Sequence, residues 1–134
     1  MGEDFQRRCD AIEEAYEFML AYAAQGAAGD SGAGSQIREF LTRAAAALTD
    51  LERVLTAIIE HERFEPADRY RSFVGVVDRD ARDSLAAIDL VLAQPSISSQ
   101  IVDNLNASIH LRALLTDLFL IDEILKAQRA PSRT

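Results

Sequence analysis

Apolar residues recur every three or four positions along four stretches of this 134-residue chain. Such spacing puts them on one side of an α-helix, so the pattern predicts four amphipathic helices, at residues 4–25, 36–63, 66–93 and 99–128. The most regular stretch has its apolar positions at Ile37, Leu41, Ala44, Leu48, Leu51, Leu55 and Ile58. Alternating runs of Val, Ile and Thr, which would indicate strands, are absent from the sequence.

Three groups of helix-breaking residues separate these stretches. Residues 26–35 hold four glycines, which predicts a flexible loop. Pro66 suits the first turn of a new helix. Pro95 suits the end of a helix, and Ser98 or Ser99 can cap the helix that follows. Each break therefore falls between two predicted helices.

The four helices are expected to form a single domain over residues 1–134, with a disordered tail at 129–134. Short connections favour antiparallel neighbours, so we expect an all-α, up-down-up-down antiparallel four-helix bundle. A rearranged four-helix domain would satisfy the same pattern. So would a set of helices that completes a bundle only in a dimer.

Charge and composition exclude some classes of partner. The net charge is −8 and the pI about 4.7, whereas nucleic-acid binding depends on clustered Lys and Arg, so we expect no nucleic acid. No apolar run approaches the ~20 residues of a membrane span, so we expect no membrane partner. A single cysteine, Cys9, and an N-terminus without an apolar signal core indicate a cytoplasmic protein. An excess of 13 Arg over 1 Lys suggests a GC-rich bacterial genome.

Neither histidine has the spacing of a metal centre. Carboxylate-bridged di-metal bundles use Glu-x-x-His pairs, but the residue three positions before His61, and the one three positions before His110, is apolar. His61 and Glu65 have an i,i+4 spacing that could form half a metal site. Pro66 disfavours a helical Glu65, so we interpret His61 as part of a helix terminus.

The other residues that could act in catalysis or bind a metal also lack a recognisable motif. Asp103, His110 and Asp117 recur every seven residues, but about 10.5 Å between successive members is too far for one zinc ion. We interpret them as a solvated polar stripe. Cys9 lies on the apolar side of its helix, where thiols are inert. We therefore expect no catalytic residue, no metal and no cofactor.

One carboxylate breaks the amphipathic pattern. Asp122 projects among the apolar residues of the last helix, where an unpaired charge would be costly, and Asn104 shares its azimuth. One interpretation is that Asp122 lies near the bundle end, reached by water or by an arginine. The other is a small polar ligand pocket formed by Asp122, Asn104 and Arg112.

The first and last helices carry more apolar surface than one buried side requires. Phe18 and Tyr22 form a second apolar side on the first helix, and Leu120 and Ile124 do so on the last. Helices that are apolar nearly all round are buried on more than one side. We expect these residues to form an interface, with a homodimer first and another protein second. Alternatively, they meet the two neighbours that each helix has within a bundle.

Two classes of function fit these observations. The first is a non-catalytic interaction protein, such as an adaptor, a regulatory bundle or a small chaperone-like protein, which offers apolar grooves to a partner helix. The second is a small-ligand or metal-binding bundle, with or without enzymatic activity, that has a polar pocket around Asp122. The residue pattern favours the first class, because no catalytic or ligand-binding motif supports the second.

Overall fold

The computed structural model describes residues 2–31 and 35–129, and this part of the chain folds into helices only. Its six helices are α1 (Gly2–Ala24), α2 (Gln36–Leu48), α3 (Leu51–Glu62), α4 (Ala67–Leu92), α5 (Ser99–Ala107) and α6 (His110–Arg129). The expected all-α class is confirmed. The count of four helices is not, because two predicted helices are each divided in two. Among the described residues, no helix has both the length and the apolar character needed to cross a membrane.

The predicted helix 36–63 is interrupted at Thr49 and Asp50, between α2 and α3. Asp50 has a left-handed φ of 57°, which ends the regular hydrogen-bond ladder. Arg8 of α1 donates to the carbonyl oxygen of Ala47 at 3.2 Å and to that of Thr49 at 2.6 Å. A side chain from another helix thus satisfies carbonyl groups that α2 leaves unpaired at its end. No Gly or Pro marks this point in the sequence, so apolar spacing alone predicted one helix.

The predicted helix 99–128 is interrupted at Ser108 and Ile109, between α5 and α6. Ile109 has a left-handed φ of 65°, an uncommon conformation for a β-branched residue. The Ser108 hydroxyl donates to the carbonyl oxygen of Leu105 at 2.6 Å. Asn104, Asn106 and Ser108 are residue types that compete with helix formation through such local bonds. That polar cluster is the sequence signal for the break.

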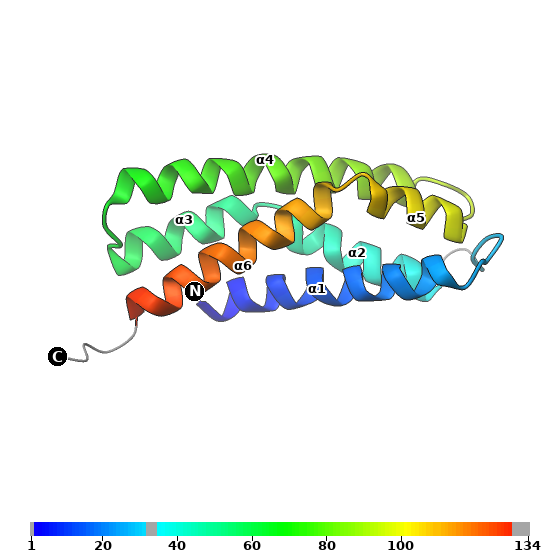
Figure 1. Cartoon of the computed structure of the whole chain (residues 1–134), viewed down its shortest axis with the longest axis horizontal. Coiled ribbons are helices and arrows are strands. Elements are labelled where there is room, and N and C mark those ends of the chain that lie inside the picture. Colours follow the sequence, from blue (N-terminus) through cyan, green and yellow to red (C-terminus); the bar gives the residue numbers. More distant parts are fainter. Residues whose placement is uncertain (1, 32–34, 130–134) are drawn as a thin grey trace.

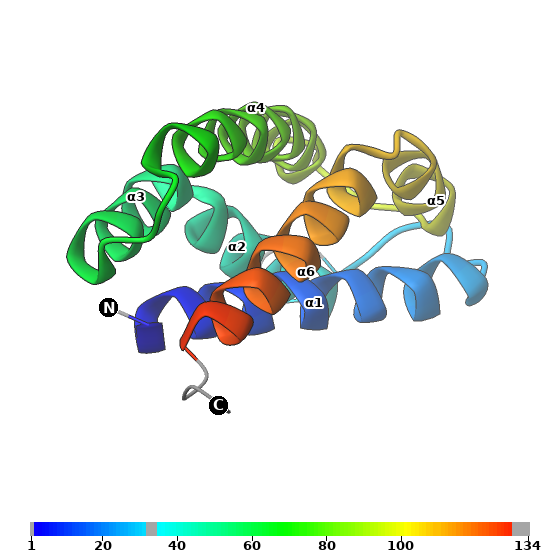
Figure 2. The ribbon, with the colours of Figure 1, turned by 60° about the vertical axis from the view of Figure 1, so that its left-hand side comes forward.

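The helices are arranged so that α1 and α4 each run along the length of the molecule (Figure 1). α2 and α3 follow one another end to end, as do α5 and α6, so the chain reverses its direction three times. Both long helices contact all four short ones. α6 lies between α1 and α4, and its end comes close to the beginning of α1 (Figure 2). Helix α6 can therefore form a groove with α1 on one side and with α4 on the other.

The apolar positions that predicted the helices form the core. All seven positions of the most regular stretch, from Ile37 to Ile58, are buried, although the chain is interrupted between them. The break therefore preserves the apolar seam. Burying each large aliphatic side chain contributes about 1.5–3 kcal/mol. The largest fully buried side chains are Ile12, Met19, Ile37, Leu41, Leu51, Leu55, Ile58, Ile88, Ile97, Leu114, Leu118 and Ile121.

A buried ion pair joins the connection after α1 to the connection after α4. The side chain of Asp30 is 2% exposed and accepts from the Nε atom of Arg38 at 2.6 Å and from the backbone N–H of Ile97 at 2.8 Å. Arg38 also donates to the carbonyl oxygens of Leu92 and Gln94. Asp30 lies within residues 26–35, so these bonds tie part of the predicted flexible loop to α2 and to the connection before α5. Residues 32–34 of that loop, and the predicted tail from 130 on, lie outside the described residues.

The predicted caps and turns agree with the structure in part. The Ser98 hydroxyl accepts from the backbone N–H of Ile101 at 3.1 Å and so caps α5, as expected. Pro66 precedes α4 as its N-cap residue. His61 lies in the last turn of α3, and Glu65 follows after that helix has ended. His61 and Glu65 are therefore not one turn apart on a helix, and the metal half-site does not form.

Candidate functional site

Helix α6 exposes three large apolar side chains close together. Phe119 is 54% exposed, Leu120 is 51% exposed and Ile124 is 37% exposed. Isolated apolar side chains are common on protein surfaces, but these three fall within about two turns of one helix. We call Phe119, Leu120 and Ile124 the α6 apolar face. Grouped apolar side chains of this kind are typical of a surface that another molecule covers.

On the α4 side, the apolar face borders a cavity of about 250 Å³. Leu120 and Ile124 form its α6 wall, and Tyr70 and Phe73 form much of its α4 wall. Among the described residues, Arg69 is the only charged one in the lining. Such a lining suits an apolar side chain from a partner, because it offers contact area and few groups that must be hydrogen-bonded.

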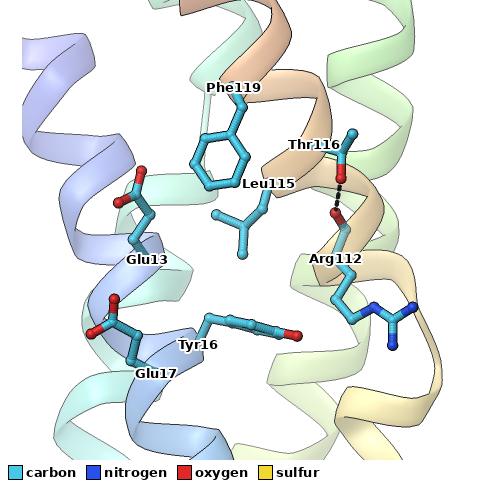
Figure 3. Close-up of a pocket in the computed structure, with 7 residues that line it drawn as sticks. All are labelled: Glu13, Tyr16, Glu17, Arg112, Leu115, Thr116 and Phe119. Carbon is cyan, nitrogen blue, oxygen red and sulfur yellow. Dashed lines mark hydrogen bonds between the residues drawn. The ribbon is translucent and has the colours of Figure 1, made fainter.

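On the α1 side, the apolar face borders a second cavity, of about 270 Å³. Its lining combines aromatic rings with charged groups (Figure 3). Tyr16 extends from α1 toward α6, and the ring of Phe119 lies above it. The carboxylates of Glu13 and Glu17 lie at the α1 edge, and Arg112 lies at the opposite edge. Leu115 and Thr116 complete the lining.

Negative charge dominates around this second cavity. Partial burial raises the pKa of Glu13, and the carboxylates of Asp10, Glu17 and Asp122 raise it further. Within the described part of the chain, Glu13, Glu17 and Arg112 make no ion pair. The carboxylates at the α1 edge are therefore free to pair with a cation supplied by another molecule.

The three residues of the predicted polar pocket do not come together. Asp122 is partly buried and pairs with Lys126, 3.0 Å away on the same helix. Arg112 lines the cavity beside α1, and it precedes Asp122 by ten residues, or about 15 Å along the helix axis. Asn104 is exposed on α5 and accepts from Gln100. The prediction assumed that Asn104 and Asp122 lie on the same side of one continuous helix. The interruption at Ile109 instead puts them on two different helices.

The four predicted interface residues divide into two groups. Tyr22 is buried, and its hydroxyl donates to the carbonyl oxygen of Ile97 at 2.6 Å. Phe18 is partly buried and stacks on Phe40, with 4.4 Å between the ring centroids. This side of α1 is therefore covered by the chain's own α2 and by the connection before α5. Leu120 and Ile124, by contrast, are exposed on α6.

Thiol and metal chemistry find no support among the described residues. Cys9 is buried, and desolvation, together with the charge of Asp122 and other carboxylates, raises the pKa of its thiol to about 12. A thiol with so high a pKa is a poor nucleophile at neutral pH. No three or more His, Cys, Asp or Glu side chains within residues 2–31 and 35–129 gather as a metal would require.

Asp103, His110 and Asp117 do not form one solvated stripe. Asp103 lies on α5 and the other two on α6, beyond the break. The carboxyl group of Asp80 on α4 neighbours Asp117, whose Oδ2 atom is buried without a donor in the described structure. Desolvation and the neighbouring carboxyl of Asp80 raise the pKa of Asp117 to about 7. No sequence pattern indicated this pair, because it depends on the register between two distant helices.

Sequence reasoning also missed the cavity beside α1. Glu13, Tyr16, Glu17 and Leu20 follow the i, i+3, i+4, i+7 spacing of one helix face. Apolar spacing alone places Tyr16 on the buried side of this helix and the two glutamates outside it. The mixture of aromatic and acidic residues on a single face was the signal that could have shown the site.

Comparison of the chain with models of protein families, with curated proteins and with solved structures gives no match. The geometry of α6 and its two flanking cavities is therefore the basis of the proposed function.

Proposed function

We propose that this protein is a non-catalytic interaction module, and that a second polypeptide covers the α6 apolar face. The observation that carries the proposal is the exposure of Phe119, Leu120 and Ile124 between two cavities. Side chains of a partner can enter a cavity on each side of α6 while the partner's backbone passes over the α6 apolar face. Helix-in-groove recognition uses such spaced apolar anchors.

The alternative class, a small-ligand or metal-binding bundle around Asp122, has less support. Lys126 neutralises Asp122, and the other two residues of the predicted pocket lie elsewhere. The cavity that does contain Arg112 is open beside the exposed Phe119. Such a position suits a side chain on a partner surface better than an enclosed small molecule.

We also infer that the six helices represent an up-down-up-down four-helix bundle in which the second and fourth helices are interrupted. End-to-end succession of α2 with α3, and of α5 with α6, supports this interpretation. A cytoplasmic and bacterial setting is proposed on composition alone, from the single Cys9 and the excess of Arg over Lys.

An unbiased selection tests the interaction proposal. A displayed library of helical peptides is selected on the wild-type protein, and the enriched peptides are then measured against the Leu120→Ser/Ile124→Ser variant. We expect the variant to bind them about tenfold more weakly or worse, which corresponds to about 1.4 kcal/mol of lost contact. Both residues are exposed, so the variant should keep its fold.

The matched control is Leu90→Ser. Leu90 of α4 is 66% exposed, and it lines neither of the two cavities beside α6. The selected peptides should bind this variant as they bind the wild type. Failure to enrich any peptide, or enrichment of peptides that bind the Leu120→Ser/Ile124→Ser variant equally well, would contradict the proposal.

A further inference from the structure

The cavity between α1 and α6 has the lining of a site for a cationic side chain. Glu13 and Glu17 supply two carboxylates that make no ion pair within the described chain, and Arg112 lies at the opposite edge of the cavity. Tyr16 and Phe119 supply two aromatic rings. A Lys or Arg side chain can pack its aliphatic stem on such rings, make cation–π contact and place its charge at the carboxylates.

We propose that the occupant of the α6 apolar face is a basic amphipathic helix of another protein. This inference rests on the function proposed above and specifies the partner's chemistry. The apolar side of that helix covers Leu120 and Ile124, and a Lys or Arg beside it enters the α1–α6 cavity between Tyr16, Phe119 and the two glutamates. The partner thus supplies apolar anchors on one flank and positive charge on the other.

The two cavities have different chemistry, and this difference fixes the orientation of the partner. The cavity beside α4 is lined by aromatic and aliphatic side chains with one arginine. The cavity beside α1 carries two glutamates at one edge and Arg112 at the opposite edge, and the carboxylates of Asp10 and Asp122 add negative charge near Glu13. A partner helix therefore needs apolar residues toward α4 and basic residues toward α1, as an amphipathic helix with one basic flank provides.

A second copy of the chain fits this site less well. Each copy has a net charge of −8. If two copies paired through the α6 apolar face, the carboxylates of Glu13, Glu17 and Glu123 would approach their own counterparts or each other. Like charges that face one another across an interface disfavour that pairing. A basic partner removes the same repulsion and adds charge complementarity.

Leu20 extends the acidic side of the site. It is 45% exposed and lies one turn beyond Tyr16 and Glu17 on α1. An apolar side chain beside the carboxylates suits the aliphatic stem of a further Lys or Arg, which buries its methylene groups while the charge stays in water. The α1 flank can accordingly receive more than one basic residue.

Three peptides of about 18 residues test the proposal, a length at which a helix becomes stable enough to compare. They share one apolar side and differ only along one flank, which carries Lys and Arg, Gln, or Glu. Affinity is measured by fluorescence anisotropy with the full chain. We expect the basic peptide to bind about tenfold more tightly than the Gln peptide, with the Glu peptide weaker still. Raising the salt concentration from roughly 50 to roughly 500 mM should reduce this preference.

Substitutions then locate the charge preference. Glu13→Gln/Glu17→Gln should reduce the preference for the basic over the Gln peptide to about twofold or less. The control Glu14→Gln/Glu60→Gln changes the net charge equally at two exposed positions outside the cavity, and it should leave the preference in place.

The outcomes separate this inference from the proposed function. If all three peptides bind equally well, and the Leu120→Ser/Ile124→Ser variant binds none of them, the inference of a basic partner is wrong. The proposal that a polypeptide covers the α6 apolar face would still hold. If the control Glu14→Gln/Glu60→Gln reduces the preference for the basic peptide as much as Glu13→Gln/Glu17→Gln does, the α1–α6 cavity is not the site that receives the basic side chain. If none of the three peptides binds, the inference is wrong. The unbiased peptide selection tests the α6 apolar face independently of these three peptides.

Discussion

The buried carboxylate of Asp30 and the partly buried carboxylate of Asp117 lie in opposite electrostatic environments. Hydrogen bonds from Arg38, with further bonds from Ser35 and the N–H of Ile97, hold the pKa of Asp30 well below its usual range. Desolvation and the carboxyl of Asp80 raise the pKa of Asp117 to about 7. The first carboxylate is satisfied as an anion, and the second is best accommodated with a proton. Their effects on stability therefore have opposite dependence on pH.

Asp117 should make the protein less stable as the pH rises. Its pKa is higher in the folded than in the unfolded chain, so the folded state binds more protons between about pH 4 and pH 7. The stabilisation that this proton provides is present below that range and lost as the pH passes about 7. We expect Asp117→Asn to melt about 4 °C above the wild type at about pH 8, corresponding to roughly 1 kcal/mol, and to show little difference at pH 4.

Thermal melts of both proteins across this pH range give the comparison. Asp89→Asn, at an exposed position of α4, is the control and should follow the wild type. A wild type that melts at the same temperature as Asp117→Asn at about pH 8 would contradict the assigned carboxyl pair.

Asp30 should be among the most costly side chains to remove. Truncating it leaves the Arg38 guanidinium and the Ile97 N–H without their buried acceptor. We expect Asp30→Ala to lower the free energy of unfolding by about 3 kcal/mol, measured by urea denaturation at neutral pH. Asp78→Ala removes the mostly exposed pair with Arg82 and should cost less than about 0.5 kcal/mol. Similar losses for the two variants would be inconsistent with a buried role for Asp30.

Individual site residues were predictable only where their own helix determined their position. Leu120 and Ile124 follow from the phase of α6, and both are exposed as that phase implies. Phe18 and Tyr22 were expected at an interface or, alternatively, against neighbours within the bundle, and Phe40 and Ile97 cover them from other parts of the chain. A contact between distant segments leaves no periodic pattern in the sequence, so the sequence could not decide between these two alternatives.

At the scale of helices, apolar periodicity predicted where the helical segments lie but not where they are interrupted. The seam from Ile37 to Ile58 stays buried across the break at Asp50, so the spacing looks continuous. Arg8 of α1 stabilises that break from outside the segment. The break at Ile109 has a local polar cluster before it, and this cluster was the better signal.

Ile109 allows a test of the second interruption. A left-handed conformation costs a residue with a Cβ atom about 1–2 kcal/mol, whereas glycine adopts it freely. The side chain is 56% exposed, so little packing is lost on its removal. We expect Ile109→Gly to raise the free energy of unfolding by about 0.5 kcal/mol, after the greater entropy of glycine in the unfolded chain is included.

Ile109→Ala provides the matched comparison, because it shortens the side chain but keeps the Cβ atom. It should give no gain in urea denaturation. If Ile109→Gly destabilises the protein as strongly as a glycine inside a helix does, by about 1 kcal/mol, then α5 and α6 form one continuous helix and the described break is wrong.

At the scale of the whole molecule, the arrangement of the six helices places α6 between the two long helices with one side uncovered. Its core side is packed by Leu114, Leu118 and Ile121, whereas Phe119, Leu120 and Ile124 face outward. One groove beside α6 is formed with α1 and the other with α4. The residues of α1 make the first groove acidic, and those of α4 make the second apolar. The sequence predicted a surplus of apolar surface on the last helix, but only the packing of α1 and α4 shows its acidic and apolar flanks.

The proposed function requires that the α6 apolar face is free to receive another polypeptide. The most direct measurement is the solution mass of the purified chain, by light scattering after size exclusion across a dilution series. We predict the mass of a monomer, 14.8 kDa, at every concentration, because repulsion between the acidic flanks opposes pairing of two copies. A stable dimer that Leu120→Ser/Ile124→Ser converts to monomer would contradict the account, since a second copy would then occupy the face.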